Sequence, residues 1–344
     1  MRMSLKNALA ITTAITSLAS AVYAESHAGE VNLYSSRHYD TDERLYTDFT
    51  EQTGIVINRI EGNADELIAR MTAEGMNSPA DILLTVDTSR LERAKNAGVL
   101  QSIDSDLLET RIPVSLQDSD NQWFGFSQRA RIIFYDKTDV ENPPLDYLSL
   151  ADPAYKGMVC HRSSTNEYSQ TLLAAVIENF GAEAATEWAQ GVVDNFARDP
   201  QGGDTDQLRG LVSGECDISI SNTYYFSRAL RVPVDGLDAE AMSHIGWIFP
   251  AQNAEGAHMN LSGGGVAAHA PNRDNAIKFL EYLASDQAQQ YFSAGNDEYP
   301  AVPGVAMSPS VAALGLFRAD AVDLSEVAKN IPQAQVIFNQ VGWE

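Results

Sequence analysis

The chain has 344 residues, which is enough for two domains that each have a core of their own. Hydrophobic residues make up 44% of it, an ordinary fraction that indicates a folded protein and excludes a disordered one. With 23 basic and 47 acidic residues the formal net charge is −24, so we expect no nucleic-acid partner. Such a negative field attracts cations, but it does not identify a ligand.

Residues 1–24 have the pattern of a secretory signal peptide. Arg2 and Lys6 form a short positive region, and the apolar run 8–21 is too short to cross a bilayer well. The small residues that end at Ala24 suit a cleavage site, so we expect the mature chain to begin just after it. A membrane anchor is the alternative interpretation, which the length and flanks of the run disfavour.

The two cysteines, Cys160 and Cys216, both lie in the mature chain, beside short strand-like runs. An exported protein meets an oxidising compartment, so two cysteines suggest one disulfide bond. A pair of metal-binding thiols is the alternative, and the absence of a C-x-x-C spacing disfavours it.

The first hundred residues alternate between strand-like and helix-like patterns. The strand-like runs are short and apolar, and each is followed by a turn and an amphipathic segment. This alternation predicts an α/β domain with a largely parallel sheet. The expected strands are 31–36, 55–58 and 81–86, and the expected helices run from Asp40 to a stop at Gly54, onward from Asn63, and from Thr88 to Ala97.

The next part of the chain begins with a strand candidate, 123–135, that is long enough to cross between two lobes. The glycine-rich run 262–267 lacks both nucleotide-binding glycine patterns, so we expect a tight loop or bulge there. The other expected elements are helices at 171–179 (ending at Gly181), 182–193, from Gly203, and 275–284, with strands at 216–220 and 245–249.

Two adjacent tyrosines, Tyr224 and Tyr225, follow the strand-like run 216–220 and open a helix that Asn222 or Thr223 is able to cap. Side chains that are adjacent in a helix lie about 100° apart, so both phenols are able to reach one point in a cleft. With 13 tyrosines in the chain, roughly half a Tyr-Tyr pair is expected by chance. The pair alone therefore favours simple aromatic packing.

Two further tyrosines, Tyr39 and Tyr168, also lie at expected strand-to-helix turns. In open α/β sheets the ligand crevice lies at the carboxyl ends of the strands, where such turns gather. We therefore expect four phenols, including Tyr224 and Tyr225, to converge on one site.

A strongly charged hard cation is able to replace the phenol proton, which is normally lost near pH 10. Fe³⁺ is the hardest common biological candidate, whereas Mg²⁺ and Ca²⁺ prefer carboxylates, carbonyls and water. Three tyrosinates neutralise Fe³⁺, and a fourth needs compensation from Arg129, Arg228 or the helix N-termini.

His38 is a candidate fifth ligand; the alternatives are a rim histidine or a hydrogen-bond partner. We expect surface or structural roles for His27, His161, His244, His258 and His269, and core positions for Tyr34, Tyr135 and Tyr282.

Three segments carry a resemblance to a known family: 34–39, 163–168 and 221–228. With them, essentially the whole mature chain resembles periplasmic iron(III)-binding proteins, the solute receptors of ABC iron transporters, and in particular their tyrosine-rich cyanobacterial-type branch. The adjacent-tyrosine motif after a strand is the most specific part of the match.

This resemblance implies the residues of an iron site. Matched position by position, the iron ligands are expected at Tyr39, Tyr168, Tyr224 and Tyr225, with Arg129 and Arg228 as supporting arginines. His38 occupies a place that serves as a ligand in some members only.

The resemblance also implies a fold and a partner. The expected fold is a type II periplasmic binding protein, with two α/β lobes, hinge strands and an interlobe cleft that closes on the metal. We assign lobe 1 to 28–127 with 255–303 and lobe 2 to 128–254 with 304–344. The implied protein is a periplasmic monomer that carries Fe³⁺ to an inner-membrane permease; Fe²⁺ stays open as the natural cargo.

Two other function classes fit parts of the pattern. A non-haem iron enzyme would use two tyrosines and two histidines, yet only His38 lies beside a candidate tyrosine, so we expect no enzyme activity. A same-fold receptor for a polyamine would need carboxylates and aromatic walls, and the arginines argue against it. A receptor for an oxyanion would rely on arginines and helix N-termini and would not need four phenols.

Overall fold

The computed structural model describes residues 28–37 and 39–344, so the expected signal peptide and His38 lie outside the described residues. The strands are β1 Glu30–Ser35, β2 Val56–Glu61, β3 Ile82–Thr85, β4 Phe124–Asp136, β5 Val159–Cys160, β6 Ile218–Asn222, β7 Ile245–Ile248, β8 Met259–Val266 and β9 Tyr299–Pro300. The α-helices are α1 Glu43–Thr53, α2 Ala64–Glu74, α3 Thr88–Asn96, α4 Asp106–Arg111, α5 Glu167–Asp194, α6 Asp204–Ser213, α7 Thr223–Arg231, α8 Ala239–His244, α9 Arg273–Leu283, α10 Asp286–Asn296, α11 Pro309–Ala312, α12 Leu324–Lys329 and α13 Ile331–Val341. Short 3₁₀ helices are η1 Asp40–Asp42, η2 Gly75–Asn77, η3 Val114–Leu116, η4 Leu148–Ala151 and η5 Pro153–Tyr155. Within the described part of the chain, no helix combines the length and apolarity needed to cross a bilayer.

The strands form a mixed sheet in the order β2-β1-β3-β8-β4-β6-β5, with β7 and β9 also paired to β4. The pairs β1–β2, β1–β3 and β5–β6 are parallel. Every pairing of β8 or β4 is antiparallel. The expected parallel sheet is therefore correct for the first three strands and wrong for the centre, where the long return strand β8 inserts beside β3.

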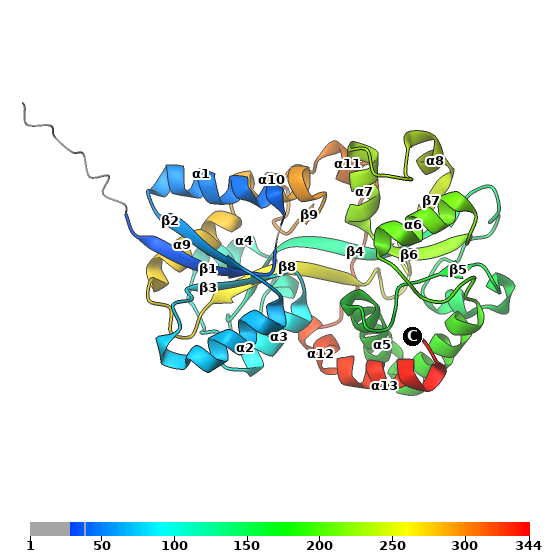
Figure 1. Ribbon diagram of the computed structural model, residues 1–344, viewed down its shortest axis with the longest axis horizontal. Coiled ribbons are helices and arrows are strands. Elements are labelled where there is room, and N and C mark those ends of the chain that lie inside the picture. The colour runs from blue at the N-terminus through cyan, green and yellow to red at the C-terminus, as the bar shows by residue number, and fades with distance from the viewer. Residues whose placement is uncertain (1–27, 38) are drawn as a thin grey trace, which may run out of the picture.

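The 13-residue strand β4 connects the two halves of the molecule. At about 3.3 Å per residue it spans about 40 Å. Its first part pairs with β8, and its second part, from Arg131 onward, pairs with β6 and β7. Figure 1 shows β4 and β8 running side by side between the lobe of β1 to β3 and the lobe of α5 to α8. The predicted crossing strand is confirmed.

Each lobe has its own apolar core. Leu33, Phe49 and Phe279 belong to a cluster built from β1–β3, α1 and α9. On the other side, Trp188 packs in a cluster of α5 and α13, and Phe226 packs in a neighbouring one around α6 and α7. The predicted two-lobed α/β fold is thus confirmed, while the lobe boundaries assigned from the sequence stay predictions.

The glycine run is a strand and not the expected tight loop, although its pairing with β4 shifts register, as at a β-bulge, opposite Ser262 and Gly263. Gly263, Gly264 and Gly265 lie inside β8, between β3 and β4. A Cβ on Gly264 would lie 2.7 Å from the carbonyl oxygen of Leu83, and one on Gly265 would lie 2.1 Å from a neighbouring backbone oxygen. Glycine is needed here because backbone approaches closely from both sides, a reason that short-range turn preferences do not reveal.

The predicted disulfide bond is present. Cys160 in β5 and Cys216, just before β6, have their Cα atoms 5.8 Å apart. The parallel pairing of β5 with β6 brings them together. The bond therefore fixes the start of β6, the strand that leads directly into α7 with Tyr224 and Tyr225.

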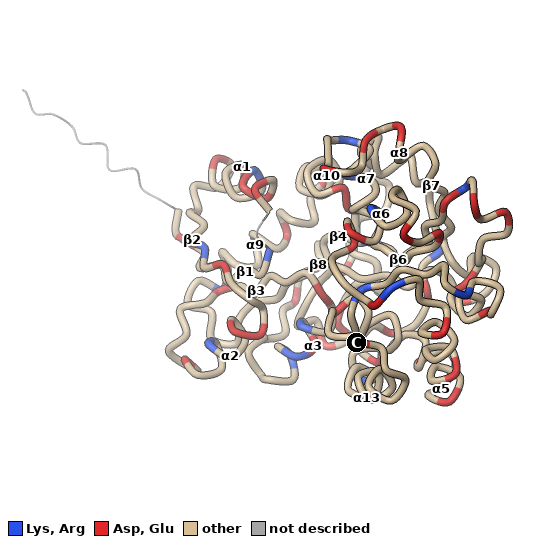
Figure 2. Tube along the Cα trace, turned by 45° about the vertical axis from the view of Figure 1, so that its right-hand side comes forward, with Lys and Arg blue, Asp and Glu red and all other residues tan. Residues whose placement is uncertain are grey.

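Acidic residues are spread over both lobes, including α1, α5 and α8 (Figure 2). In contrast, three arginines are buried near the centre: Arg37, Arg129 and Arg131 are at most 2% exposed. A buried cation is costly unless it is paired, so the groups around these arginines decide what the central region is able to bind.

Candidate metal centre

Tyr39 lies in the turn that follows β1, at the N-cap of the short helix η1 that leads into α1. The guanidinium carbon of Arg37 lies 4.9 Å from the centre of its ring. Burial and then the negative charge of Glu298 raise the pKa of Tyr39, while Arg37 and Arg129 oppose the increase. The strand-to-helix turn predicted for this tyrosine is therefore correct.

Tyr168 lies in the first turn of α5, where the side chain of Asn166 accepts a hydrogen bond from its backbone N–H at 3.0 Å. The side chain is buried. The guanidinium carbons of Arg129, Arg131 and Arg162 all lie 5.6–5.7 Å from the centre of its ring. The ring of this phenol therefore has three arginines around it.

Tyr224 and Tyr225 lie in the first turn of α7, directly after β6, as predicted. Their ring centres are 4.1 Å apart and the ring planes are 30° apart, so both phenols leave the helix on the same side. Asn222 occupies the N-cap position, but its side chain does not cap the helix as expected. It accepts instead from Nη1 of Arg131 at 3.4 Å.

The four tyrosines form one electrostatic cluster. Burial raises the pKa of Tyr224 well above its usual value, and the next largest causes are the charges of Tyr168, Tyr225 and Tyr39. Burial likewise raises the pKa of Tyr168, to which Tyr39 and Tyr225 add. The structure therefore brings the four predicted phenols together, one from the first lobe and three from the second.

Arg129 lies on β4 among these phenols and is buried. Burial lowers its pKa, but the charges of Tyr168, Glu298, Tyr224 and Tyr39 raise it overall. Its Nη1 donates to Oγ of Ser262 at 2.9 Å and pairs with Oε1 of Glu298 at 3.1 Å. The sequence-based prediction placed this arginine beside the site, and its surroundings fit that role.

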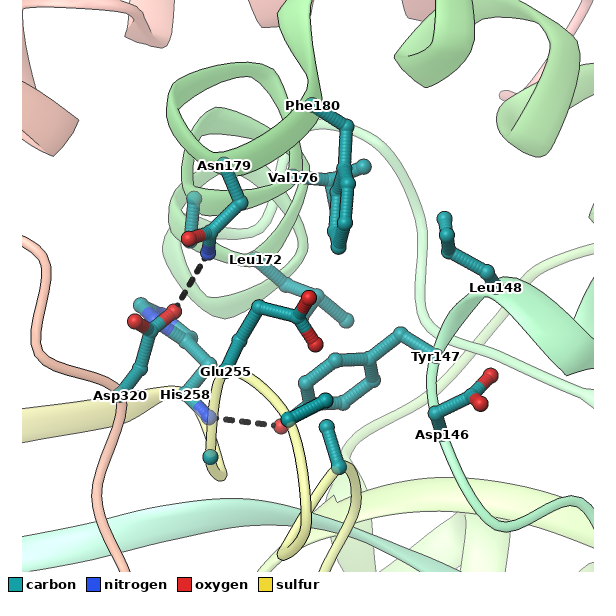
Figure 3. Close-up of a pocket in the computed structure, with 14 residues that line it drawn as sticks. Asp146, Tyr147, Leu148, Leu172, Val176, Asn179, Phe180, Glu255, His258 and Asp320 are labelled. Atoms are coloured by element: carbon teal, nitrogen blue, oxygen red, sulfur yellow. Dashed lines mark hydrogen bonds between the residues drawn. The ribbon is translucent and has the colours of Figure 1, made fainter.

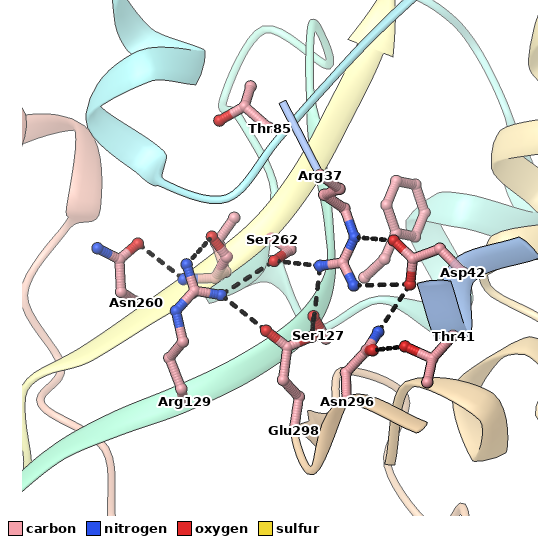
Figure 4. A network of polar contacts seen from close by, with 12 residues as sticks. Arg37, Thr41, Asp42, Thr85, Ser127, Arg129, Asn260, Ser262, Asn296 and Glu298 are labelled. Atoms are coloured by element: carbon pink, nitrogen blue, oxygen red, sulfur yellow. Dashed lines mark hydrogen bonds and ion pairs between the residues drawn. The ribbon is translucent and has the colours of Figure 1, made fainter. Parts of the chain in front are cut away.

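Glu298 links Arg129 to a second buried arginine, as Figure 4 shows. Its Oε2 lies 3.3 Å from Nη1 of Arg37, whose Nε is 2.7 Å from Oδ2 of Asp42. Each of these charges has an opposite partner, so the network holds the turn before Tyr39 against β4. Glu298 was not among the predicted residues, because only the fold brings it into contact with Arg37, 261 positions away.

A second network lies behind Tyr168 and Tyr225. Asp204, fully buried at the start of α6, accepts from Nη1 of Arg131 at 2.7 Å and pairs with Arg162 at 3.4 Å. Burial raises the pKa of Asp204, but the two arginines hold it below its usual value. The sequence-based prediction did not include Arg131, Arg162 or Asp204. Arg129 and Arg131 are two positions apart in one strand, so their shared face was a visible signal for Arg131.

Arg228 lies one turn beyond the tyrosine pair, with its guanidinium carbon 5.8 Å from the ring centre of Tyr224. Its side chain is one-third exposed, and its Nε lies 3.9 Å from Oδ2 of Asp297. Arg228 follows Tyr224 by four residues in α7, a spacing that places both side chains on one face of the helix. Its role in metal binding stays a prediction.

Few other metal donors are available. Residues 28–37 and 39–344 contain no group of three or more His, Cys, Asp or Glu side chains placed to hold a metal ion. His38 lies outside the described residues, so its predicted part as a ligand stays a prediction. Tyr34 is not part of the four-tyrosine cluster: it is buried in β1, with its hydroxyl 3.3 Å from Oε2 of Glu74. Phenol oxygens are therefore the distinctive donors of this cluster.

These features define an extracellular solute receptor: two lobes, two connecting strands and a polar cluster built from both sides. The profile of the bacterial extracellular solute-binding protein family matches residues 44–319, and the chain belongs to this family. It is 47% identical over 316 residues to iron uptake protein A1 of Synechocystis, covering 92% of this chain and 88% of the relative.

Solved structures agree. A Trichodesmium protein, IdiA (FutA), in complex with iron and citrate, matches with a TM-score of 0.88 and 46% identity, covering 92% of this chain and all of the other. A ferric binding protein from Campylobacter jejuni matches with a TM-score of 0.83 and 40% identity over 91% of this chain and all of the other.

Proposed function

We propose that this protein captures Fe³⁺ between its lobes and delivers it to an ABC permease. Tyr39, Tyr168, Tyr224 and Tyr225 are the proposed ligands. The observation that carries the proposal is the gathering of four phenols from two lobes, three of them close to the buried Arg129. The names of the relatives, an iron uptake protein and ferric binding proteins, support the same cargo.

The chemistry of the donors selects the cargo. Burial raises the pKa of all four tyrosines, so each keeps its proton at neutral pH unless a strong positive charge displaces it. A bound trivalent cation reverses this preference, because its own charge dominates the local field. Oxygen donors of this kind favour a hard ion such as Fe³⁺ over Zn²⁺ or Cu²⁺, which prefer nitrogen and sulfur.

The charge balance also suits a trivalent ion. Four tyrosinates carry one more negative charge than Fe³⁺ compensates. Arg129 is already close to three of the phenols, and Arg228 lies beside Tyr224. Arg131 and Arg162 share the single carboxylate of Asp204, so their network keeps one net positive charge beside Tyr168. By proximity to the phenols we assign the compensating role to Arg129 and Arg228, helped by this net charge, with His38 as a proposed fifth ligand.

The alternative cargoes fit less well. A polyamine would meet Arg129, Arg131 and Arg162 around Tyr168, and these like charges would repel it. An oxyanion would find arginines, but it would not use four buried phenols. A non-haem iron enzyme would need further nitrogen donors and an open coordination position, so we propose a transport role without catalysis.

The transport cycle follows from the two-lobed fold. Fe³⁺ bound by Tyr39 on one lobe and three tyrosines on the other would hold the lobes closed. The closed form would then dock on an inner-membrane permease as a monomer, after export to the periplasm. Release would follow protonation of the phenolates or reduction to Fe²⁺, which binds phenolate less strongly.

Visible absorption tests this proposal, since tyrosinate-to-iron charge transfer colours the complex. Purified protein mixed with ferric citrate and desalted should turn orange to red and retain about one iron per chain. The same protein should not retain sulfate, and an excess of spermidine should not reduce the iron colour. A colourless, iron-free protein after ferric citrate treatment would contradict the assignment.

A further inference from the structure

A cavity lies in the lobe of α5, beside the part of this helix that begins one turn after Tyr168. Its volume is about 150 Å³, and it is bounded by α5, the segment 146–148, the segment 251–256, His258 and Asp320 (Figure 3). A cavity of about this size is able to hold a molecule as large as benzene. None of the four proposed iron ligands lines it.

The walls of the cavity are apolar and aromatic. Leu172 and Val176 of α5 form one side, and the rings of Phe180 and Tyr147 face the space between them (Figure 3). The hydroxyl of Tyr147 donates to the carbonyl oxygen of Arg131 at 2.6 Å, which fixes its ring in place. An apolar group of four or five atoms would therefore bury its surface here without rearranging the wall.

Three carboxylates stand around the apolar space: Asp146, Glu255 and Asp320. Asp320 is anchored by Asn179, whose Nδ2 donates to its Oδ2 at 2.6 Å, and Asp146 accepts from the backbone N–H of Ser149 at 2.7 Å. The residues that line the cavity include no lysine or arginine. These negative charges therefore have no cationic partner among the lining residues.

His258 supplies an independent sign of a missing partner. It lines the cavity and is only 2% exposed, yet neither ring nitrogen has a hydrogen-bond partner within the described residues. Its backbone N–H does have one, the hydroxyl of Tyr147 at 2.9 Å. A buried, unpaired polar group costs about 1–3 kcal/mol, so a donor group brought by a ligand would recover part of that cost.

We propose that this cavity is a second binding site, for a small alkylammonium cation. The alkyl chain fills the apolar space between α5 and Tyr147, and the ammonium group lies among Glu255, Asp320 and His258. An ammonium has three N–H donors and no acceptor, which matches two carboxylates and one unprotonated ring nitrogen. An aromatic wall adds cation–π attraction.

Other ligand classes fit the cavity poorly. An anion would be repelled by three carboxylates, and a bare metal ion would meet apolar walls in place of most of its ligands. A neutral hydrocarbon would fill the space but leave the carboxylates and His258 unpaired. The site shares no lining residue with the proposed iron ligands, so it stands whether or not the protein binds iron.

Calorimetric titration with n-butylammonium chloride tests the site, with n-butanol as the neutral probe of similar shape. Both are titrated into the full mature protein, iron-free and iron-treated, in buffer of moderate salt. We expect saturable binding of one n-butylammonium per chain under both conditions, at least about tenfold tighter than n-butanol. Glu255→Gln and Asp320→Asn should each weaken n-butylammonium binding about tenfold.

Matched variants separate a built site from general attraction to an acidic protein. Glu187→Gln removes an exposed carboxylate from α5, outside the cavity, and should leave binding unchanged. Val176→Phe fills the cavity while keeping every charge, so it should abolish binding. Circular dichroism checks that each variant is folded. The proposal is overturned by non-saturable binding, by equal binding of n-butanol, or by equal losses in Glu187→Gln and Glu255→Gln.

Discussion

Arg231 and Asp297 form a bidentate ion pair that joins the helix of the tyrosine pair to the opposite lobe. Nε of Arg231 lies 2.9 Å from Oδ1 of Asp297, and its Nη2 lies 2.7 Å from Oδ2. Arg231 ends α7, whose first turn carries Tyr224 and Tyr225. Asp297 follows α10, which packs in the core of the first lobe. The pair therefore fixes how α7 faces the lobe that carries Tyr39.

Replacing Asp297 with asparagine should destabilise the fold. Asp297 is fully buried and adopts a left-handed backbone conformation (φ 61°), which asparagine also tolerates, so the substitution removes charge without backbone strain. We expect the free energy of unfolding to fall by about 1–2 kcal/mol, since Arg231 is one-third exposed and water screens the pair. Urea denaturation of the iron-free protein measures this.

Glu61→Gln is the matched control for this prediction. It also removes one carboxylate from an arginine pair, but Glu61 is exposed and its partner, Arg59, keeps a second contact with Glu43. We expect a loss of less than about 0.5 kcal/mol. Equal losses in Asp297→Asn and Glu61→Gln would mean that the pair between the lobes is energetically unimportant.

Removing the disulfide bond should cost more. Cys160 and Cys216 are 56 positions apart, and closing a loop of that length restricts the unfolded chain by about 4 kcal/mol in the chain-entropy model. The double variant Cys160→Ser, Cys216→Ser should therefore unfold at a lower urea concentration than the oxidised wild type. Wild-type protein under reducing conditions should match the variant; a reduced protein as stable as the oxidised one would contradict the prediction.

A buried histidine should make the fold sensitive to acid. Burial and then the charge of Arg131 lower the pKa of His258 from 6.5 to about 4. Between these values the unfolded chain binds a proton that the folded protein refuses, so this contribution is complete above pH 6.5 and is lost as the pH falls toward 4. The loss should reach about 3 kcal/mol at pH 4, measured by urea denaturation across the pH range.

The difference between variants isolates this effect from the titration of carboxylates. His258→Asn should show a shallower loss of stability between pH 6.5 and 4 than the wild type. His244→Asn removes an exposed histidine and should keep the wild-type slope. If His258→Asn and the wild type lose stability in parallel, another group is responsible for the acid sensitivity.

Arg228→Ala should weaken iron retention without removing a ligand. The guanidinium lies 5.8 Å from the ring of Tyr224 and would balance the fourth tyrosinate. We expect the colour of the iron complex to persist, while its affinity against a competing chelator falls about tenfold. Arg44→Ala is the control, because Arg44 stacks 4.5 Å from the ring of Tyr291, outside the cluster, and should change neither quantity.

Local patterns were enough to predict much of the site. Tyr39, Tyr168 and Tyr224 each follow a turn signal next to a strand-like run, and these turns form where expected. The break in α5 at Gly181 also matches, since this residue adopts φ 82° and ψ 163° and separates two helical stretches. Such features depend on neighbouring residues only, so the sequence carries them directly.

Contacts between distant segments could not be predicted in this way. Glu298 joins Arg37 and Arg129 only after β4, β8 and the segment following α10 have met. Likewise, Gly264 is fixed by the close approach of β3, which depends on sheet order and not on local preference. The buried charges that support the tyrosines therefore emerge from the fold, whereas the tyrosines themselves were visible in the sequence.

An iron titration of matched tyrosine variants decides whether these phenols hold the metal. Tyr225→Phe removes a proposed ligand, whereas Tyr34→Phe removes the hydroxyl of a buried tyrosine that contacts Glu74 outside the cluster. With ferric citrate, Tyr34→Phe should develop the full visible absorption of the wild type. Tyr225→Phe should lose much of it, and its iron affinity should fall by more than the roughly 10- to 100-fold typical of outer-shell partners. Full colour and unchanged affinity in Tyr225→Phe would show that Tyr225 is not an iron ligand.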